Sequence, residues 1–375
     1  LDIKVIDNNG ADISDLATIY FNGQVIDGTS VEVTTKGSYV ISANYKGLDA
    51  PDFNINADVV SAIILEKDRP NTIPGGFIRL TAKDNFGNEI PGNVNYEING
   101  NSYSEGVFSF DVVDDYTVTA TYNSMFNGEI SGEISFGVKN YTKRVLVEDY
   151  TGAWCGYCPR DAYKLEKAEE LNPKVIGLGI HNGDAMFFSE ESAMRAAFNV
   201  SGFPTAKINR MSNWSESSLP WDGPFSSLDN LTGDKAEVGI GFASTLSGSS
   251  LSLDLDIEFA TTTTGKKLVV YLVEDGLVYP QANYFNANSS TPWFAKGNPI
   301  TNFVHNNVLR TSLTDVFGDE IIVDEGKDVY NYQKTINLDS RYNSEQIEII
   351  AFVVDGSGKV VNVQHANLGE SVGLD

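Results

Sequence analysis

The stretch Asp149-Tyr-Thr-Gly-Ala-Trp-Cys155-Gly-Tyr-Cys158-Pro159 holds the only two cysteines of the 375-residue chain. Loop-closure entropy grows with loop length, so a disulfide across so short a loop constrains the unfolded chain very little. A pair at this spacing therefore suits a bond that is made and broken. Half of a metal site and an inert disulfide are the alternatives. A zinc site usually takes four ligands, whereas this chain has no second cysteine pair and its three histidines are scattered, so we expect no metal here.

The sequence around the cysteines predicts an α/β segment. Apolar runs indicate strands, and apolar residues at helical spacing indicate helices, in the order strand 144–149, helix 159–171, strand 175–180, helix 190–198 and strand 204–208. This order is typical of a parallel or mixed sheet. Cys155 then stands at a strand-to-helix junction, where a helix N-terminus stabilises a thiolate. We expect Cys155 to be the more exposed, attacking sulfur and Cys158 the resolving one.

The rest of the chain is predicted to be β-structure. A shift of 84 − 7 = 77 positions superposes Asp7, Asn22-Gly23 and Tyr39 on Asp84, Asn99-Gly100 and Tyr116, which indicates two tandem Ig-like β-sandwiches. Residues 61–80 have almost no counterpart in the first copy, so we expect that copy to lack residues upstream. Beyond residue 235, about seven predicted strands, which include 251–259 and 302–310, indicate a β-sandwich or jelly roll.

The predicted fold class is therefore multidomain α/β plus all-β, with four domains. The boundaries are 1–57 for an Ig-like β-sandwich incomplete at its N-terminus, 58–140 for a second one, 141–234 for the α/β domain and 235–375 for the C-terminal β-sandwich.

Composition excludes several classes of partner. The chain has 26 basic and 51 acidic side chains, and 26 − 51 gives a net charge of −25. This balance argues against binding to nucleic acid and to anionic lipid surfaces. No run approaches the roughly 20 apolar residues of a membrane span, so we expect no transmembrane segment in this chain. We also expect no cofactor.

Other candidate groups have plainer explanations. His181 is expected at a loop or strand end, and His305 and His365 are expected to be structural. The Asp/Asn/Gly runs at 7–12 and 84–88 are better explained as turns than as calcium sites. A long loop at 280–299 is rich in aromatic residues, and long ordered loops are often functional. Packing is the expected role, and a partner-binding rim the alternative, for Trp214, Trp221, Trp293 and Phe294.

Three motifs resemble the thioredoxin superfamily. Trp154-Cys155-Gly156-Tyr157-Cys158 resembles its active-site pentapeptide, Asp149 matches its buried acid, and Gly202-Phe203-Pro204-Thr205 resembles its cis-proline loop. The resemblance implies a thioredoxin-like fold for the α/β domain. It also implies a peptide groove shaped by Pro204 and lined by Trp154, Gly156, Tyr157, Phe203 and Thr205. Because strand neighbours face opposite ways, we expect only one of Glu148 and Asp149 to point inward; Asp149 is then a proton acceptor or a solvated strand-end acid.

A longer set of residues resembles one family more closely. The run 148–159, followed by His181-Asn-Gly-Asp184 and Asn209-Arg210, is similar to the Omp28 family of Bacteroidetes envelope proteins. In that family a thioredoxin-like domain precedes a β-rich one. The resemblance implies an exported protein of the periplasm, the outer membrane or the cell surface, with a lipid anchor upstream of this chain.

Two functions are consistent with these patterns. The first is an envelope thiol-disulfide oxidoreductase that exchanges disulfides with protein or peptide thiols and works with a redox partner that the sequence does not identify. The second is a surface adhesion or binding lipoprotein, in which the β-sandwiches act and the cysteine-containing domain is a scaffold.

Overall fold

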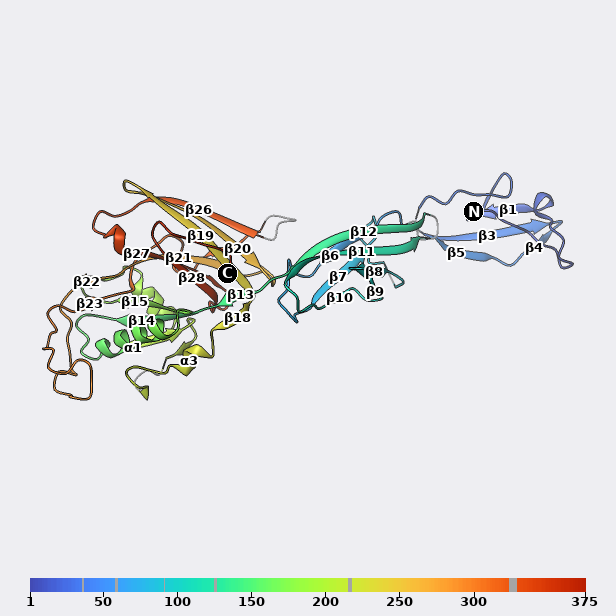
Figure 1. The fold of residues 1–375 in the computed structure, drawn as a ribbon. Coiled ribbons are helices and arrows are strands. Elements are labelled where there is room, and N and C mark those ends of the chain that lie inside the picture. Colours follow the sequence, from blue (N-terminus) through green and yellow to red (C-terminus); the bar gives the residue numbers. More distant parts are fainter. Residues whose placement is uncertain (36, 58–59, 91, 125–126, 215–217, 324–328) are drawn as a thin grey trace. The chain divides into compact units, whose positions relative to one another are not determined.

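The computed structural model describes residues 1–375 except 36, 58–59, 91, 125–126, 215–217 and 324–328. Strands predominate over helices throughout the described residues (Figure 1). The chain divides into two compact units. The first consists of residues 1–68, 79–108 and 116–135, and the second of residues 69–78, 109–115 and 136–375.

The first unit begins with a five-stranded antiparallel sheet. Its strands are β1 (Thr18–Phe21), β2 (Gln24–Val25), β3 (Gly37–Tyr45), β4 (Leu48–Asp49) and β5 (Phe53–Ala57). A short 3-10 helix, Ser14–Leu16, precedes them. The small core is formed by Ile19, Ile41 and Ala43.

Two further sheets follow in the chain. One contains β6 (Ile64–Lys67), β7 (Ile78–Lys83) and β10 (Val107–Phe108); the other contains β8 (Asn95–Ile98), β9 (Asn101–Tyr103), β11 (Asp114–Ser124) and β12 (Gly128–Val138). The ring of Tyr96 on β8 meets that of Phe108 on β10 edge-on, with centroids 5.9 Å apart. The two sheets therefore pack face to face around a shared core.

The predicted repeat is confirmed at its turns. Asn22-Gly23 joins β1 to β2 and Asn99-Gly100 joins β8 to β9, and all four residues have positive φ, as a two-residue hairpin turn requires. The Asp7 carboxylate accepts the N–H groups of Asn9 and Ala11. Asp84 accepts those of Phe86 and Asn88 in the same way. Both acidic runs are therefore turns, as expected.

The second unit is built on one nine-stranded sheet. β14 (Val145–Thr151) pairs in parallel with β15 (Val175–His181) and antiparallel with β16 (Thr205–Ile208), and β17 (Ser212–Asn213) follows β16 at the edge. On its other side β15 pairs in parallel with β24 (Val308–Ser312), with Gly179 opposite Val308. β21 (Lys267–Glu274), β25 (Asp319–Glu320), β27 (Ile347–Val354) and β28 (Val360–Asn367) complete it in antiparallel pairs.

Both faces of this sheet are covered near β14 and β15. α1 (Cys158–Leu171) and α3 (Ser226–Asp229) pack over the face that carries Val145 and Val147. α2 (Glu191–Ala197) packs over the opposite face, which carries Leu146 and Tyr150. Every residue of β14 and β15 is consequently buried. This explains why the apolar runs 145–147 and 175–180 do not alternate with polar residues.

A smaller sheet covers the C-terminal part of the large one. It consists of β19 (Val238–Ser247), β20 (Ser250–Phe259), β26 (Val329–Asn337) and β29 (Ser371–Val372). The core between the two sheets joins alternate residues of β20, such as Leu253 and Leu255, to Leu268 and Val270 of β21. The remaining elements are a 3-10 turn at Ser344–Gln346 and two short pairs, β13 (Tyr141–Lys143) with β18 (Gly233–Ala236) and β22 (Leu277–Val278) with β23 (Val304–His305). Among the described residues, no helix is long and apolar enough to cross a membrane.

The predicted fold class is wrong in its α/β component. We expected a thioredoxin-like α/β domain between β-sandwiches, yet the described chain is mostly β-sheet with three helices, α1, α2 and α3. The strands predicted for that domain share one sheet with β21, β24, β27 and β28 of the C-terminal part. The physical reason is the parallel pairing of β15 with β24, which leaves no free sheet edge between the two parts. An all-β multidomain fold describes the chain.

Candidate functional site

The two cysteines form a disulfide in the turn between β14 and α1. Their Cα atoms are 5.4 Å apart, which is usual for this bond. α1 begins at Cys158 and has Pro159 in its first turn, as the sequence predicted. Cys155 is 5% exposed and Cys158 is 1% exposed. Cys155 is thus the more exposed of the two, as expected, although both side chains are buried in the oxidised protein.

Pro204 lies at the same end of the sheet as the cysteine turn. It precedes β16, and Thr205, the first residue of β16, is paired with Tyr150 near the end of β14. The Phe203–Pro204 peptide is cis, as the resemblance implied. The half-exposed Trp154 packs edge-on against Phe203, with ring centroids 5.3 Å apart, and its Nε1 donates to the Asn182 carbonyl at 2.7 Å. Trp154, Phe203 and Thr205 therefore come together on one side of the turn.

The other side of the turn is covered by residues 279–300, which we call the strap. The Ala282 N–H donates to the Ala153 carbonyl at 2.8 Å, and the Tyr284 N–H donates to the Gly156 carbonyl at 2.9 Å. The buried Gln281 amide donates from Nε2 to the Cys155 carbonyl at 2.8 Å. Three hydrogen bonds thus hold the strap along the cysteine turn.

Gly156 is needed where the strap meets the turn. A Cβ atom on Gly156 would lie 2.4 Å from the ring of Tyr284, closer than atoms can approach. Tyr157, which is half-exposed, packs edge-on against Tyr284 and Phe285 at centroid distances of 5.2 and 5.8 Å. Both residues were predicted to contact a substrate, and in this structure both contact the strap.

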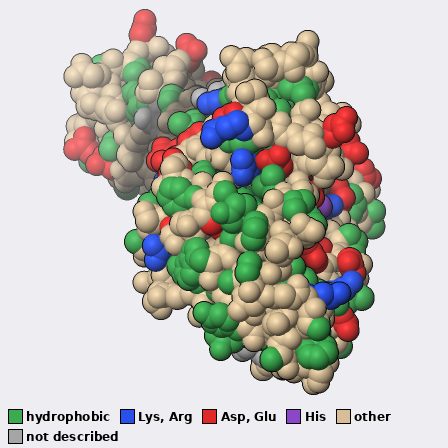
Figure 2. All heavy atoms as spheres, turned by 90° about the vertical axis from the view of Figure 1, so that its left-hand side faces the viewer, with side chains coloured by type: hydrophobic (Ala, Val, Ile, Leu, Met, Phe, Trp, Pro, Cys, Tyr) green, Lys and Arg blue, Asp and Glu red, His purple; other side chains and the backbone are tan. Residues whose placement is uncertain are grey.

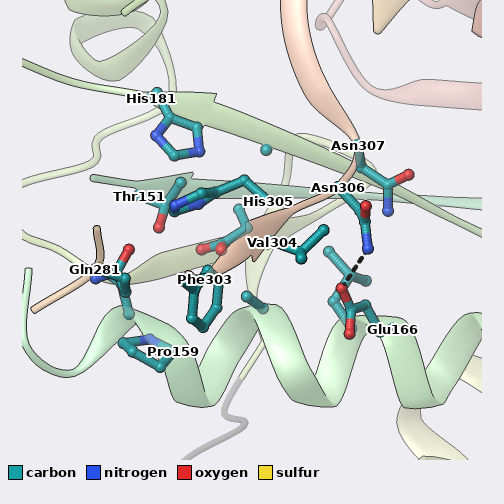
Figure 3. A pocket seen from close by; sticks show the side chains of 15 residues that line it. Thr151, Pro159, Glu166, His181, Gln281, Phe303, Val304, His305, Asn306 and Asn307 are labelled. Carbon is teal, nitrogen blue, oxygen red and sulfur yellow. Dashed lines mark hydrogen bonds between the residues drawn. The ribbon is translucent and has the colours of Figure 1, made fainter. Parts of the chain in front are cut away.

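A small cavity with both polar and apolar lining residues lies behind Cys158 (Figure 3). It measures about 30 Å³, enough for one or two water molecules. Cys158 and Asp149 are among its lining residues. In Figure 3, Thr151, His181 and His305 line one end, and Glu166, Asn306 and Asn307 line the other. Among the described residues, no group of three or more His, Cys, Asp and Glu side chains is placed to hold a metal ion.

The two histidines at this cavity are in contact. The rings of His181 and His305 meet edge-on at 5.2 Å, and both side chains are buried. Burial and the neighbouring His181 lower the pKa of His305 to about 4, so His305 is neutral at neutral pH. A carbonyl can only accept, so its contact with the Tyr279 carbonyl at 3.2 Å places the His305 proton on Nε2.

Asp184 connects His181 to the cysteine turn. Its Oδ2 lies 2.7 Å from His181 Nδ1 and also accepts the Ala153 N–H at 2.7 Å. Burial disfavours the charged carboxylate, but hydrogen bonds from His181 and from the backbone hold the pKa of Asp184 below its usual value. An anionic Asp184 therefore holds both the His181 imidazole and the backbone N–H of Ala153, two residues before Cys155.

Glu148 and Asp149 are both buried, so the expectation that only one points inward is wrong. Because β14 has both faces covered, Asp149 faces the cavity beside Cys158 and Glu148 faces the opposite core. Glu148 Oε1 lies 3.0 Å from Nε of the buried Arg210. Burial raises the pKa of Glu148, and the positive charge of Arg210 opposes that shift.

Three of the tryptophans pack against other aromatic residues, and three site residues were not predicted. Trp214 is buried in the core beside Phe225, and Trp221 and Trp293 each pack against Tyr163 of α1, as the packing interpretation expected. His305, Gln281 and Asp184 were missed as site residues. Asp184 could have been found from the sequence, since it lies in the motif His181-Asn-Gly-Asp184. His305 and Gln281 could not, because β23 and the strap come near the cysteines only through tertiary structure.

Comparison with known proteins finds one family. Residues 191–372 match the family model described as outer membrane protein Omp28. The Omp28 resemblance predicted from the sequence is supported. The matched range begins beyond Cys158, so the Omp28 match does not bear on the cysteine pair. No curated protein matches the chain.

Several solved structures are similar in part. HBP35 of Porphyromonas gingivalis aligns over 61% of this chain and 76% of its own, with 19% identity and a TM-score of 0.49. Domains 4 and 5 of the S-layer protein SbsC cover 36% and 78%, with 14% identity and a TM-score of 0.16. An amphioxus IgVJ-C2 molecule covers 33% and 87%, with 15% identity and a TM-score of 0.21. All three TM-scores are below 0.5, so none of these likenesses transfers a fold or a function.

Proposed function

We propose that this protein is a thiol-disulfide oxidoreductase that exchanges disulfides with protein or peptide partners through Cys155 and Cys158. The observation that carries the proposal is the place of the pair, which joins a buried strand to the first turn of α1 with Asp149 and a water-sized cavity behind Cys158. A disulfide in such a short turn adds little to stability, whereas this setting suits exchange.

The exchange takes place in two steps. A partner thiolate attacks Cys155 Sγ, so that a partner–Cys155 bond forms, the Cys155–Cys158 bond breaks and Cys158 leaves as a thiolate. A second partner thiolate then attacks the partner sulfur and releases Cys155. The partner is oxidised to a disulfide and the protein is reduced to a dithiol. The reverse sequence reduces a partner disulfide, with Cys155 as the attacking thiolate and Cys158 resolving the mixed disulfide.

The surrounding residues supply the other requirements of this chemistry. Cys158 must gain or lose a proton although it is buried, and Asp149, which lines the same cavity, is the group that we assign to that transfer. Pro204, Phe203 and Thr205 flank the turn opposite the strap, beside Trp154, and we assign this side to the partner polypeptide. Gly156 and Tyr157 hold the strap.

We place the protein in the cell envelope. The Omp28 description names outer membrane proteins, and its match covers residues 191–372. A lipid anchor and the redox partner belong to the same proposal.

A binding role for the β-structure is the second candidate. One observation favours it, because the family match lies wholly outside the cysteine pair. In that case the β-sheets would bind a surface partner and the disulfide would be a local clip.

Turnover separates the two candidates. Reduction of insulin by dithiothreitol should be accelerated by the wild-type chain and not by Cys155→Ser, which removes the attacking sulfur. No acceleration by the wild-type chain at any ratio of reduced to oxidised glutathione would refute the oxidoreductase proposal and leave the binding role.

A further inference from the structure

The strap covers the redox turn on one side. Its backbone donates to the carbonyls of Ala153 and Gly156, and its Gln281 side chain donates to that of Cys155. The ring of Tyr284 occupies the space where a side chain at residue 156 would project. These contacts account for the small exposure of Cys155 although the residue lies in a surface turn.

The strap is also braced internally, so it is more than a loose loop. The Asn283 side chain donates to the carbonyls of Trp293 and Gly297 at 3.0 and 2.9 Å. The Asn286 side chain accepts the Gly297 N–H at 2.7 Å, and the backbones of Gln281 and Ile300 pair at the base. These contacts make the strap a compact loop with close ends above its β22–β23 base.

Further aromatic contacts fasten the strap to α1. Trp293 Nε1 donates to the Pro159 carbonyl at 2.9 Å, and its ring packs against Tyr163 at 5.9 Å. Phe285 packs edge-on against Trp221 at 5.5 Å. The strap therefore spans the turn from the cysteines to the first turns of the helix, and it contains a single charged residue, Lys296.

The side opposite the strap remains open to a narrow partner. Trp154, which packs against Phe203 on that side, is 50% exposed. Figure 2 looks onto the end of the unit where β22, β23 and the strap lie, and uncharged and hydrophobic side chains cover much of its lower part. In a chain of net charge −25, the strap end of the unit is therefore largely uncharged.

We propose that the strap, through Gln281 and Tyr284, selects the substrates of the redox pair. It admits small thiols and slender, extended polypeptide segments to Cys155 and excludes thiols on the surface of folded domains. This inference rests on the proposed exchange function and deepens it by naming the substrate class.

The test measures access to Cys155 and does not depend on turnover. In a Cys158→Ser background Cys155 is the only thiol, and its rate of alkylation is measured with N-ethylmaleimide and with the same maleimide coupled to a small folded protein. Each rate is divided by the rate at which the same reagent alkylates N-acetylcysteine, so that the intrinsic reactivities of the two reagents cancel. The corrected rate with the coupled maleimide should be about tenfold lower or less, because it reacts only when the strap opens locally.

Tyr284→Ala should raise the corrected rate with the coupled maleimide by about fivefold, because one aromatic pair contributes about 1 kcal/mol and about 1.4 kcal/mol is tenfold. Gln281→Ala should act in the same direction. Phe294→Ala is the matched control, since Phe294 is a strap aromatic whose side chain is 46% exposed, and it should change neither rate. Tryptophan fluorescence of each variant confirms the fold.

Equal corrected rates for the two reagents with an unaltered strap would overturn the inference. So would a rate ratio that Tyr284→Ala and Gln281→Ala leave unchanged. If insulin turnover is present and the ratio is one, the exchange function stands and the strap does not select. If turnover is absent and the ratio is large, the strap shields a disulfide that is not catalytic, and the substrate assignment is wrong.

Discussion

Removing Arg210 should destabilise the second unit strongly, because it leaves a charge in the core. Arg210 and Glu148 have side chains only 1% and 0% exposed, and they are joined Nε to Oε1 at 3.0 Å. Arg210 Nη2 also donates to Tyr271 Oη at 2.6 Å and to the Val316 carbonyl at 3.1 Å. Its guanidinium lies 4.8 Å from the ring centre of Phe198 and 4.7 Å from that of Phe352. The Glu148 side chain is fully buried, so solvent does not contact it in this structure.

The magnitude follows from this burial. Removal of one member of a buried pair typically costs about 3–5 kcal/mol, so Arg210→Met should lower the unfolding free energy by about that amount. For a unit of this size, the loss corresponds to a fall in melting temperature of about 6–20 °C. The double variant Glu148→Leu/Arg210→Met should recover most of it, because no charge then remains buried.

The effect of Arg210→Met should also increase with pH. Burial already raises the pKa of Glu148, and without the guanidinium the carboxyl group binds its proton still more tightly in the folded state. The protonated carboxyl preserves stability at low pH, and that stability is lost as the pH rises through the pKa of the folded state. The destabilisation should therefore be smaller at pH 5 than at pH 8.

The assay is urea unfolding followed by tryptophan fluorescence. All four tryptophans lie between residues 154 and 293, so the signal reports on the second unit. Arg341→Met is the matched control, because Arg341 forms an exposed pair with Asp339 that solvent screens, and it should leave the transition unchanged. A double variant as unstable as Arg210→Met would refute the reasoning, since the loss would then be one of packing.

Two further predictions concern titratable groups around α1. Burial raises the pKa of Glu169 to about 8, so the folded state holds a proton that the unfolded chain releases near its ordinary value. Stability should fall by up to about 1.4 kcal/mol per pH unit between these two pKa values, and Glu169→Gln should remove that slope in fluorescence-detected unfolding at several pH values. Asp149→Asn should slow the Cys158 step of exchange by about a hundredfold in stopped-flow measurements, because the proton acceptor is lost. Glu166→Gln, at the other end of the same cavity, should have little effect, and equal slowing by both substitutions would contradict the assignment to Asp149.

Local features of the fold were predictable from the sequence. Apolar spacing predicted a helix over 159–171, and α1 spans Cys158–Leu171. The alternation in 251–259 predicted a strand, and β20 covers Ser250–Phe259. Asn22-Gly23 and its repeat predicted hairpins because few other residues adopt positive φ there. These signals all act between residues close in the chain.

Long-range pairing was not predictable in the same way. The contact of Gly179 with Val308 joins strands more than a hundred residues apart, and nothing in either segment specifies the other. The predicted strand 302–310 is instead divided into β23 and β24, with Asn307 between them at positive φ. That division brings His305 to the cavity. The contact of the strap with Gly156 also joins distant parts of the chain. The sequence therefore identified the two cysteines but not the loop that covers them.

Trapping a mixed disulfide tests the central claim most directly. The Cys158→Ser and Cys155→Ser chains are each mixed with a disulfide-bridged peptide, and the products are identified by mass spectrometry without reductant. The account predicts that Cys158→Ser accumulates a peptide joined to Cys155, because the resolving sulfur is absent, and that Cys155→Ser, whose remaining sulfur is buried, does not. Adducts on neither chain, or equally on both, would contradict an exchange site in which Cys155 attacks and Cys158 resolves.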